Sequence, residues 1–245
     1  MKEYFRLTRT LSYSLLFALP LLLLYELGTL WVAGSDPHAL RNGADVLLRS
    51  LFAAGGLQGT ATFTGALVAV ALLLILLERR RQRVPLRAAT FGGMAVESVV
   101  YALLFGVVVG TMTTWMLGGM GFRLAAWEGG LDRLSVSQGI VLSLGAGVYE
   151  ELVFRVLLVG GLWALFRSSG LQPGRSGVFA ALLAALIFSA FHYIGPYGDQ
   201  WARTSFLFRF LAGLAFSALF LLRGFGITAW THALYDIFIF ASRGI

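Results

Sequence analysis

The stretch that decides the fold is residues 61–83, which read ATFTGALVAVALLLILL followed by ERRRQR. The first part carries no charge over a length close to the about 20 apolar residues that a membrane-spanning helix needs. The second part is a block of charges that cannot enter hydrocarbon at low cost. The stretch therefore predicts a spanning helix over approximately Ala61–Leu77 that ends in a cytoplasmic loop.

The composition of the whole chain extends this pattern. The 245 residues are 58% hydrophobic and only 13% charged, and the mean hydropathy is +0.80. These values exceed what a water-soluble globule needs to fill one core. We expect an all-α, polytopic transmembrane helix bundle of about seven spans, forming a single integral membrane domain over residues 1–245.

Further apolar runs and the basic residues between them predict the topology. The other spans are expected at approximately Leu11–Val32, Phe91–Leu117, Gly139–Phe166, Val178–Ile194, Ser205–Leu222 and Ile227–Phe240. Basic residues are more numerous in the segments on the side of the N-terminus, which predicts a cytoplasmic N-terminus and an exterior C-terminus. The segment 118–138 is expected to be an exterior loop or surface helix. The net charge of +7 then reflects membrane orientation and gives no reason to expect a nucleic-acid partner.

Ionisable residues inside the later spans are the candidates for function. They are Glu150, Glu151 and Arg155 in one span, His192 in the next, and His232 with Asp236 in the last. Each ionisable side chain in hydrocarbon costs about 3 kcal/mol on insertion scales, so each requires a partner or a function. Two of the three histidines of the chain are therefore intramembrane.

Helical spacing assigns relationships among these residues. Glu151 and Arg155 are four residues apart, share a helix face and can form an ion pair. Glu150 points about 100° away from Glu151 around the helix, so it is not committed to the arginine and suits a general base. The same spacing places two further pairs on common faces: Phe188 with His192, and His232 with Asp236.

One free carboxylate, two imidazoles and a second carboxylate are the groups that water activation requires. We expect Glu150 to take a proton from water and His192 either to orient that water or to share the proton. His232 could donate a hydrogen bond to the carbonyl oxygen as it becomes an oxyanion. Peptide hydrolysis would then proceed without a covalent intermediate.

Other protease chemistries fit the sequence less well. An aspartyl dyad needs two intramembrane aspartates, and Asp236 alone qualifies. A serine motif, G-x-S-G, occurs at residues 174–177, but it lies in a polar loop broken by Pro173. The absence of Cys excludes disulfide bonds, thiolate metal sites and a cysteine nucleophile.

The three motifs resemble those of the CAAX protease and bacteriocin-processing (CPBP) family of membrane endopeptidases. That family has E-E-x-x-x-R on one helix, F-x-x-x-H on the next and H-x-x-x-N or a similar residue on a later one. The chain has EELVFR at 150–155, FSAFH at 188–192 and HALYD at 232–236. The resemblance covers approximately residues 139–240, which would carry the protease core, with accessory spans over 1–138.

The resemblance implies cleavage by a glutamate-activated water, with no metal or other cofactor. Glu150 would be the base, His192 its partner, and His232 with residue 236 the oxyanion donors; Glu151, Arg155 and Phe188 would support them. The eukaryotic members carry asparagine at the position of Asp236. This departure matters because an ionised carboxylate cannot donate a hydrogen bond to an oxyanion.

The resemblance also implies the substrates, and the shortness of the chain and its richness in Arg, Gly, Ala and Leu suggest a bacterial source. Eukaryotic members cleave prenylated C-terminal tails, and bacterial members cleave peptide precursors or, in sortase-like members such as the myxosortases, anchored C-terminal sorting tags. We therefore expect a membrane-anchored or lipid-modified peptide or protein substrate, in the lipid bilayer of a bacterial cytoplasmic membrane.

Two rival hypotheses keep the same residues. In one, two histidines and the carboxylates bind zinc or iron, giving a metal-dependent membrane protease. In the other, the polar cluster binds a ligand in a non-catalytic scaffold, immunity factor or transporter. Chelation tests the first, and Glu150→Gln tests the second, since a non-catalytic function would survive it.

Three further charged residues near or within spans have no motif around them. We expect Glu26 and Glu97 to make hydrogen bonds between packed helices, and Arg209 either to reach the exterior face or to meet Asp199. The predicted spans also place His192 nearer the exterior and His232 nearer the cytoplasm than Glu150. The helices must therefore tilt or break if these three residues are to meet.

Overall fold

The structure is a computed structural model that describes residues 2–32, 40–56, 58–118, 134–194 and 198–242. These residues form helices and short connections, with no strand among them. The expected all-α membrane bundle is thereby confirmed. Most of the predicted exterior segment 118–138 lies outside the described residues.

The helices follow the predicted spans closely. Their bounds are α1 (Lys2–Thr8), α2 (Leu11–Val32), α3 (Gly43–Ala54), α4 (Thr60–Arg81), α5 (Ala88–Met116), α6 (Val136–Gly145), η3 (Ala146–Glu150), η4 (Leu152–Val159), α7 (Gly160–Ser168), α8 (Pro173–Phe191), α9 (Arg203–Arg223) and α10 (Phe225–Ser242). Five of them, α2, α4, α5, α8 and α9, are long and apolar enough to cross a membrane. The other two predicted spans coincide with α10 and with the run from α6 to α7, which carry most of the polar site residues. The number of spans and the orientation stay predictions.

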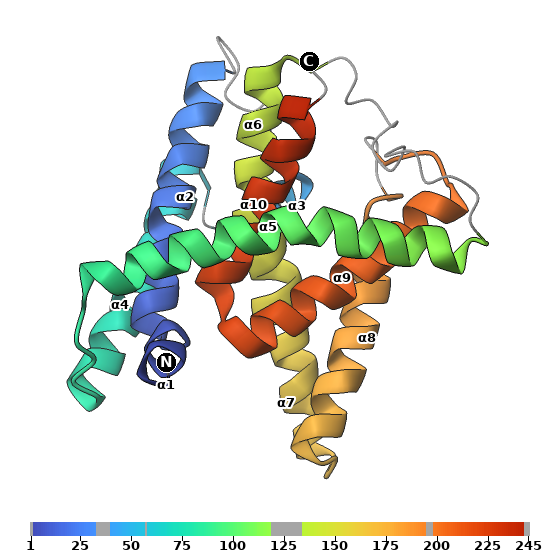
Figure 1. Ribbon diagram of the computed structural model, residues 1–245. Helices are drawn as coiled ribbons and strands as arrows, with labels where there is room; N and C mark the ends of the chain where they lie inside the picture. The colour runs from blue at the N-terminus through green and yellow to red at the C-terminus, as the bar shows by residue number, and fades with distance from the viewer. Residues whose placement is uncertain (1, 33–39, 57, 119–133, 195–197, 243–245) are drawn as a thin grey trace.

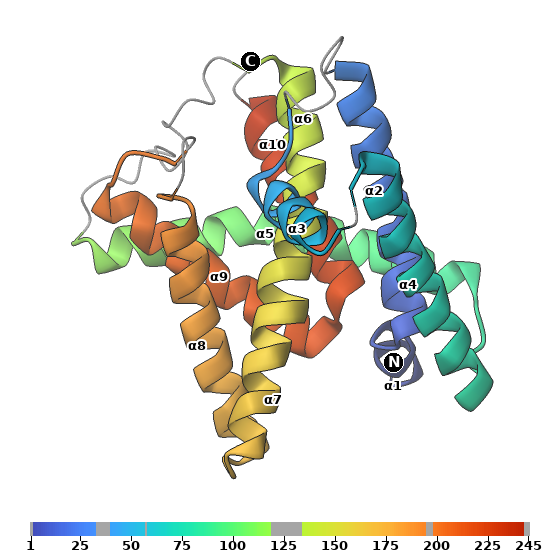
Figure 2. The same ribbon diagram turned by 180° about the vertical axis from the view of Figure 1, so that it is seen from behind.

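The helices pack around α10 and the run from α6 to α7. Helices α2, α6 and α10 run side by side and contact one another, while α5 crosses in front of α10 (Figure 1). Helices α7, α8 and η4 form a second contacting group, with α9 against α8. The short helix α3 lies on the face opposite α5, against η3 (Figure 2).

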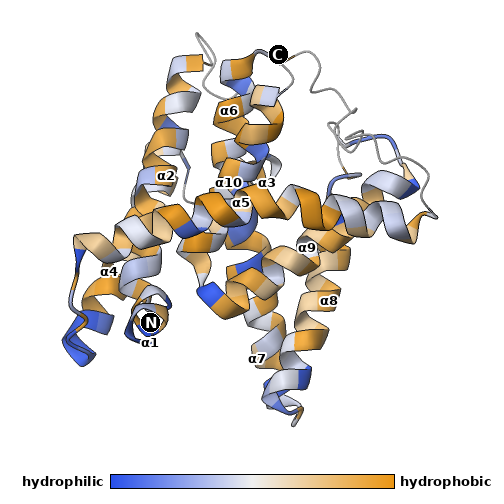
Figure 3. Ribbon diagram, in the orientation of Figure 1, coloured by the Kyte–Doolittle hydropathy of each residue, from blue (hydrophilic) through white to orange (hydrophobic). Residues whose placement is uncertain are grey.

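Hydrophilic residues gather at one end of the bundle. The connection between α4 and α5 and the ends of α7 and α8 are hydrophilic, and they lie at the same end as the N-terminus (Figure 3). Along α4, by contrast, Leu72, Leu73 and Leu76 are exposed, as expected for side chains that face lipid. The assignment of this end to the cytoplasm stays a prediction.

The central run from α6 to α7 contains two π-helical segments, η3 and η4, on either side of Glu151. Such segments widen the helix and are frequent at functional sites. Next to them, η3 packs directly against α10, because Gly147 has no side chain. A Cβ at Gly147 would lie only 2.5 Å from the Ala229 carbonyl oxygen and 2.7 Å from the Cβ of Ala233. The glycine therefore allows the close approach that brings Glu150 and His232 together.

Candidate active site

Glu151 is the structural centre of the candidate site. Its side chain is fully buried, and Oε2 lies 3.2 Å from Nε of Arg155, which confirms the predicted ion pair. Its other oxygen, Oε1, lies 2.7 Å from Nδ1 of His232 on α10. This second contact was not predicted. Glu151 therefore ties its own helix to α10.

Aromatic rings hold the Arg155 guanidinium in place. It lies over the ring of Phe188 at 4.5 Å and over that of Phe216 at 5.3 Å, both favourable cation–π distances. The Phe216 ring also stacks on the His232 imidazole at 4.4 Å. Phe188 therefore contacts the Arg155 guanidinium, whereas the contact of Phe216 on α9 was not predicted, because this residue lies in a mainly apolar run.

Glu150 has different partners from its neighbour Glu151. It accepts a hydrogen bond of 2.8 Å from the side-chain amide of Asn42, and it interacts electrostatically with His192 and His232. Arg155 pairs with Glu151 rather than with Glu150. The side chain is 9% exposed, so it is buried but not sealed. Glu150 is thus a carboxylate whose electrostatic partners include two imidazoles.

His192 lies at the C-terminal end of α8, where the helix stops. Its Nδ1 is 2.9 Å from the Phe188 carbonyl oxygen. Because a carbonyl can only accept, Nδ1 carries the proton and Nε2 of the neutral ring is left as an acceptor. The chain after it is held by a 2.9 Å bond from the Asp199 amide to the His192 carbonyl oxygen, and Asp199 pairs with Arg209. The second alternative predicted for Arg209 is therefore confirmed.

His232 lies between two carboxylates. Besides the bond of Nδ1 to Glu151, its Nε2 lies 3.5 Å from Oδ2 of Asp236, one turn further along α10. Both carboxylates accept, so the geometry favours a ring with protons on both nitrogens. A distance of 3.5 Å is longer than a strong hydrogen bond, so the Nε2 proton is not committed to Asp236.

Three of the four catalytic candidates, Glu150, His192 and His232, interact electrostatically despite their predicted difference in depth. His192 and His232 both act electrostatically on Glu150, so one local environment contains all three. Two features of the helices account for this. The π-helical segments change the register of the central run, and α8 ends at Phe191, so that His192 follows the last helical residue.

The remaining charged residues within spans have structural partners. Glu26 accepts bonds from Arg49 at 2.6 Å and from the Tyr149 hydroxyl at 2.8 Å. Glu97 pairs with Arg223 of α9 at 2.5 Å and accepts from the Tyr4 hydroxyl at 2.7 Å. The predicted hydrogen bonds between helices are confirmed, and both glutamates form ion pairs in addition.

Among the residues that the structure describes, Asn42 makes a hydrogen bond with Glu150 that was not predicted. It is the N-cap of α3, and its carbonyl Oδ1 accepts from the Ala44 amide. The sequence did carry a signal, because an asparagine just before an amphipathic segment is a preferred helix start. That signal identifies the cap but not its contact with a residue 108 positions later.

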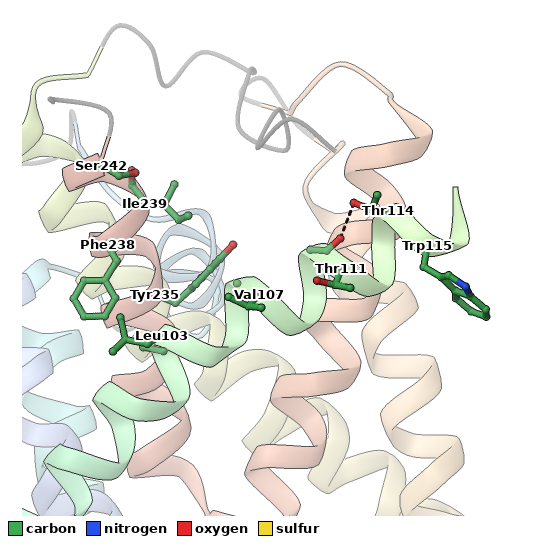
Figure 4. A pocket seen from close by; sticks show the side chains of 12 residues that line it. Leu103, Val107, Thr111, Thr114, Trp115, Tyr235, Phe238, Ile239 and Ser242 are labelled. Carbon is green, nitrogen blue, oxygen red and sulfur yellow. Dashed lines mark hydrogen bonds between the residues drawn. The ribbon is translucent and has the colours of Figure 1, made fainter. Parts of the chain in front are cut away.

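Metal ligation and cavities are two further features of the described residues. Within the described ranges, no group of three or more His, Cys, Asp and Glu side chains is placed to hold a metal ion. A hollow of about 690 Å³ lies between α5 and α10, with Leu103, Val107 and Tyr235 among its lining residues (Figure 4). Its lining includes none of the predicted site residues.

Comparison with known proteins agrees with the motifs. Residues 132–238 match the family model described as type II CAAX prenyl endopeptidase Rce1-like. No curated protein and no solved structure matches the chain. The matched segment includes every predicted site residue, from Glu150 to Asp236. Residues 132–238 are therefore similar to the Rce1-like type II CAAX prenyl endopeptidases, and this match together with the apolar helices supports an integral membrane endopeptidase.

Proposed function

We propose that the protein hydrolyses a peptide bond with a water molecule that Glu150 activates. The observation that carries this proposal is the division of labour between two adjacent acids. Glu151 forms the ion pair with Arg155 and the bond to His232, whereas Glu150 interacts electrostatically with His192 and His232 first and with the already paired Arg155 after them. A carboxylate placed in this way can accept a proton, which an acid held in an ion pair does poorly.

The proposed reaction gives a separate role to each of four polar side chains, and Glu150 acts first as the base and then as the acid. Glu150, assisted by Nε2 of His192, removes a proton from water, and the resulting hydroxide attacks the peptide carbonyl carbon. The carbonyl oxygen becomes an oxyanion and accepts a hydrogen bond from Nε2–H of His232. Asp236 orients that ring. The proton held by Glu150 then passes to the leaving amine, and no covalent intermediate forms.

The proposed substrate is a membrane-anchored or lipid-modified peptide or protein, cut near its membrane-associated end. Two observations support this class. The site residues lie on helices of a membrane bundle, and the matching family is described as prenyl endopeptidases. A bacterial cytoplasmic membrane, and anchored C-terminal sorting tags as an alternative to prenylated tails, belong to the same proposal.

The test is cleavage of a farnesylated CAAX-type peptide by the purified protein in lipid nanodiscs. We expect the wild type to release the C-terminal tripeptide, Glu150→Gln to lose this activity, and Glu3→Gln, which changes an exposed glutamate, to keep it. Full activity of folded Glu150→Gln would contradict the glutamate mechanism.

Chelation and a search for natural substrates complete the test. We expect activity to survive exhaustive chelation, whereas activity that chelation abolishes and zinc restores would favour the metal-dependent rival. If the wild type leaves the farnesylated peptide intact, membrane proteomes of cells with and without the chain would show whether anchored C-terminal tags are processed instead.

A further inference from the structure

Asn42 stands in a connection that the motifs do not cover, yet its side chain reaches the proposed base. Its Nδ2 lies 2.8 Å from Oε1 of Glu150, and both residues are buried, each 9% exposed. A hydrogen bond to an ionised carboxylate in a buried place is among the stronger hydrogen bonds in proteins. The contact therefore affects both the position and the charge of Glu150.

Two further bonds fix the position of Asn42 and the orientation of its side-chain amide. Its Oδ1 accepts from the Ala44 amide at 2.9 Å, as an N-cap does. The oxygen is thereby committed to α3, so the NH₂ group must face Glu150. The Asn42 backbone amide in turn donates to the Tyr25 hydroxyl at 3.1 Å. The side-chain amide cannot rotate without breaking the bond of Oδ1 that caps the start of α3.

A buried ionic network holds α3 itself against α2. The Tyr25 hydroxyl donates to Asp45 at 2.8 Å, and Asp45 lies between Arg41 at 2.7 Å and Arg49 at 2.5 Å. Arg49 also reaches Glu26 of α2 at 2.6 Å. The helix that carries Asn42 is thus fastened to the bundle by charges on both sides of its first turns.

We propose that Asn42 is a positioning residue of the active site, which holds Oε1 of Glu150 and leaves Oε2 to meet the water. This inference rests on the proposed role of Glu150 as the base. The other groups that act on Glu150 are charged or titratable: Arg155 on η4, His192 after α8, and His232 and Asp236 on α10. Asn42 differs from them because it is neutral and keeps its donor at every pH.

The test uses a readout that does not need a substrate. Dicyclohexylcarbodiimide reacts with protonated carboxyl groups in membranes, and fragmentation of the labelled peptide distinguishes Glu150 from Glu151. Labelling of the full-length protein in nanodiscs across pH gives the pH of half-maximal labelling at Glu150. Asn42→Asp and Asn42→Ser both keep an oxygen that can cap α3 but remove the amide donor.

We expect both variants to move half-maximal labelling of Glu150 to higher pH by about one pH unit or more, since a hydrogen bond to a charged group is lost. Labelling of Glu97 should not move. Ser135→Ala is the matched control, because it removes the N-cap of α6 without touching Glu150. An unchanged value in Asn42→Ser, or an equal shift in Ser135→Ala, would overturn the proposal.

An activity measurement separates this inference from the proposed function. With the farnesylated peptide, the acidic limb of the kcat/KM profile should move to higher pH in Asn42→Ser and stay in place in Ser135→Ala. If labelling shifts but the wild type cleaves no peptide, the contact stands and the proposed function fails. If the wild type cleaves and Asn42→Ser keeps the wild-type profile, the positioning role fails and the proposed function stands.

Discussion

Two buried polar networks in this molecule differ in how their charges are compensated. The anchor network comprises Glu26, Asp45, Arg41 and Arg49 on α2, α3 and the connection between them; the site network comprises Glu150, Glu151, Asp236, Arg155, His192 and His232. In the anchor network each acid meets two arginines. In the site network three acids share one arginine and two histidines.

The difference is the physical reason for the structural role that we assign to one network and the reactive role that we propose for the other. An acid and an arginine that are buried together both stay charged, and removal of either leaves an uncompensated charge. An imidazole, by contrast, gains and loses its proton near neutral pH. A carboxylate compensated by imidazoles can therefore exchange protons, and Asn42 connects this group to the anchor network.

The largest expected effect comes from neutralising one acid in each network and comparing the two variants. Glu150→Gln should lower kcat about 10²- to 10⁴-fold, the usual contribution of a general base, with little change in Tm. Glu26→Gln should instead lower Tm, because Arg49 loses a charged partner, and leave the kcat of the folded fraction within a few-fold of the wild type. Thermal unfolding in nanodiscs and peptide cleavage measure the two quantities. A fall in kcat of equal size in both variants would remove the distinction.

The second prediction concerns Glu151, which belongs to the site network but pairs with an arginine, as the acids of the anchor network do. Glu151→Ala should destabilise the fold by about 3–5 kcal/mol, because it leaves Arg155 buried without its carboxylate and removes the tie to His232. The double variant Glu151→Leu with Arg155→Met should recover most of that loss, since no unpaired charge remains. Denaturation monitored by tryptophan fluorescence checks both. A single variant as stable as the wild type would show that Glu151 is not a structural centre.

The sequence sufficed for the spans and for the local pairs. Apolar runs predicted α2, α4 and α5, because hydrocarbon imposes a length and a composition on a helix. The four-residue spacing predicted the pair of Glu151 and Arg155, since i and i+4 share a face in any helix close to the α form. Both predictions depend only on neighbours along the chain.

The parts that could not be predicted depend on distant contacts. Asn42 meets Glu150 across 108 positions, and Phe216 carries no polar atom that would mark it in an apolar run. The π-helical turns around Glu151 have no signature in a hydrophobic pattern of period 3.6. The sequence therefore predicted the polar residues of the candidate site and the pair of Glu151 and Arg155, but not the contacts of Asn42 and Phe216 with them.

The third prediction concerns the packing that joins the site network to α10. Gly147→Ala should cost about 1–3 kcal/mol, since its Cβ would overlap the Ala229 carbonyl and neither backbone can yield. Gly161→Ala in α7 is the matched control, because a Cβ there meets nothing within 4 Å. It should be neutral or slightly stabilising, as alanine favours a helix. Equal Tm values for the two variants would mean that η3 and α10 do not pack as described.

The smallest expected effect concerns the position at which the chain departs from the family motif. Asp236→Asn keeps the size of the side chain and supplies an amide donor, while it removes the charge 3.5 Å from Nε2 of His232. Because Glu151 still holds Nδ1 of the same ring at 2.7 Å, the imidazole keeps its orientation and kcat should change by less than about 10-fold. A loss as large as that of Glu150→Gln would show that the Asp236 carboxylate itself takes part in proton transfer. The comparison would then extend to two reactive acids on two helices, with Glu151 alone as the structural one.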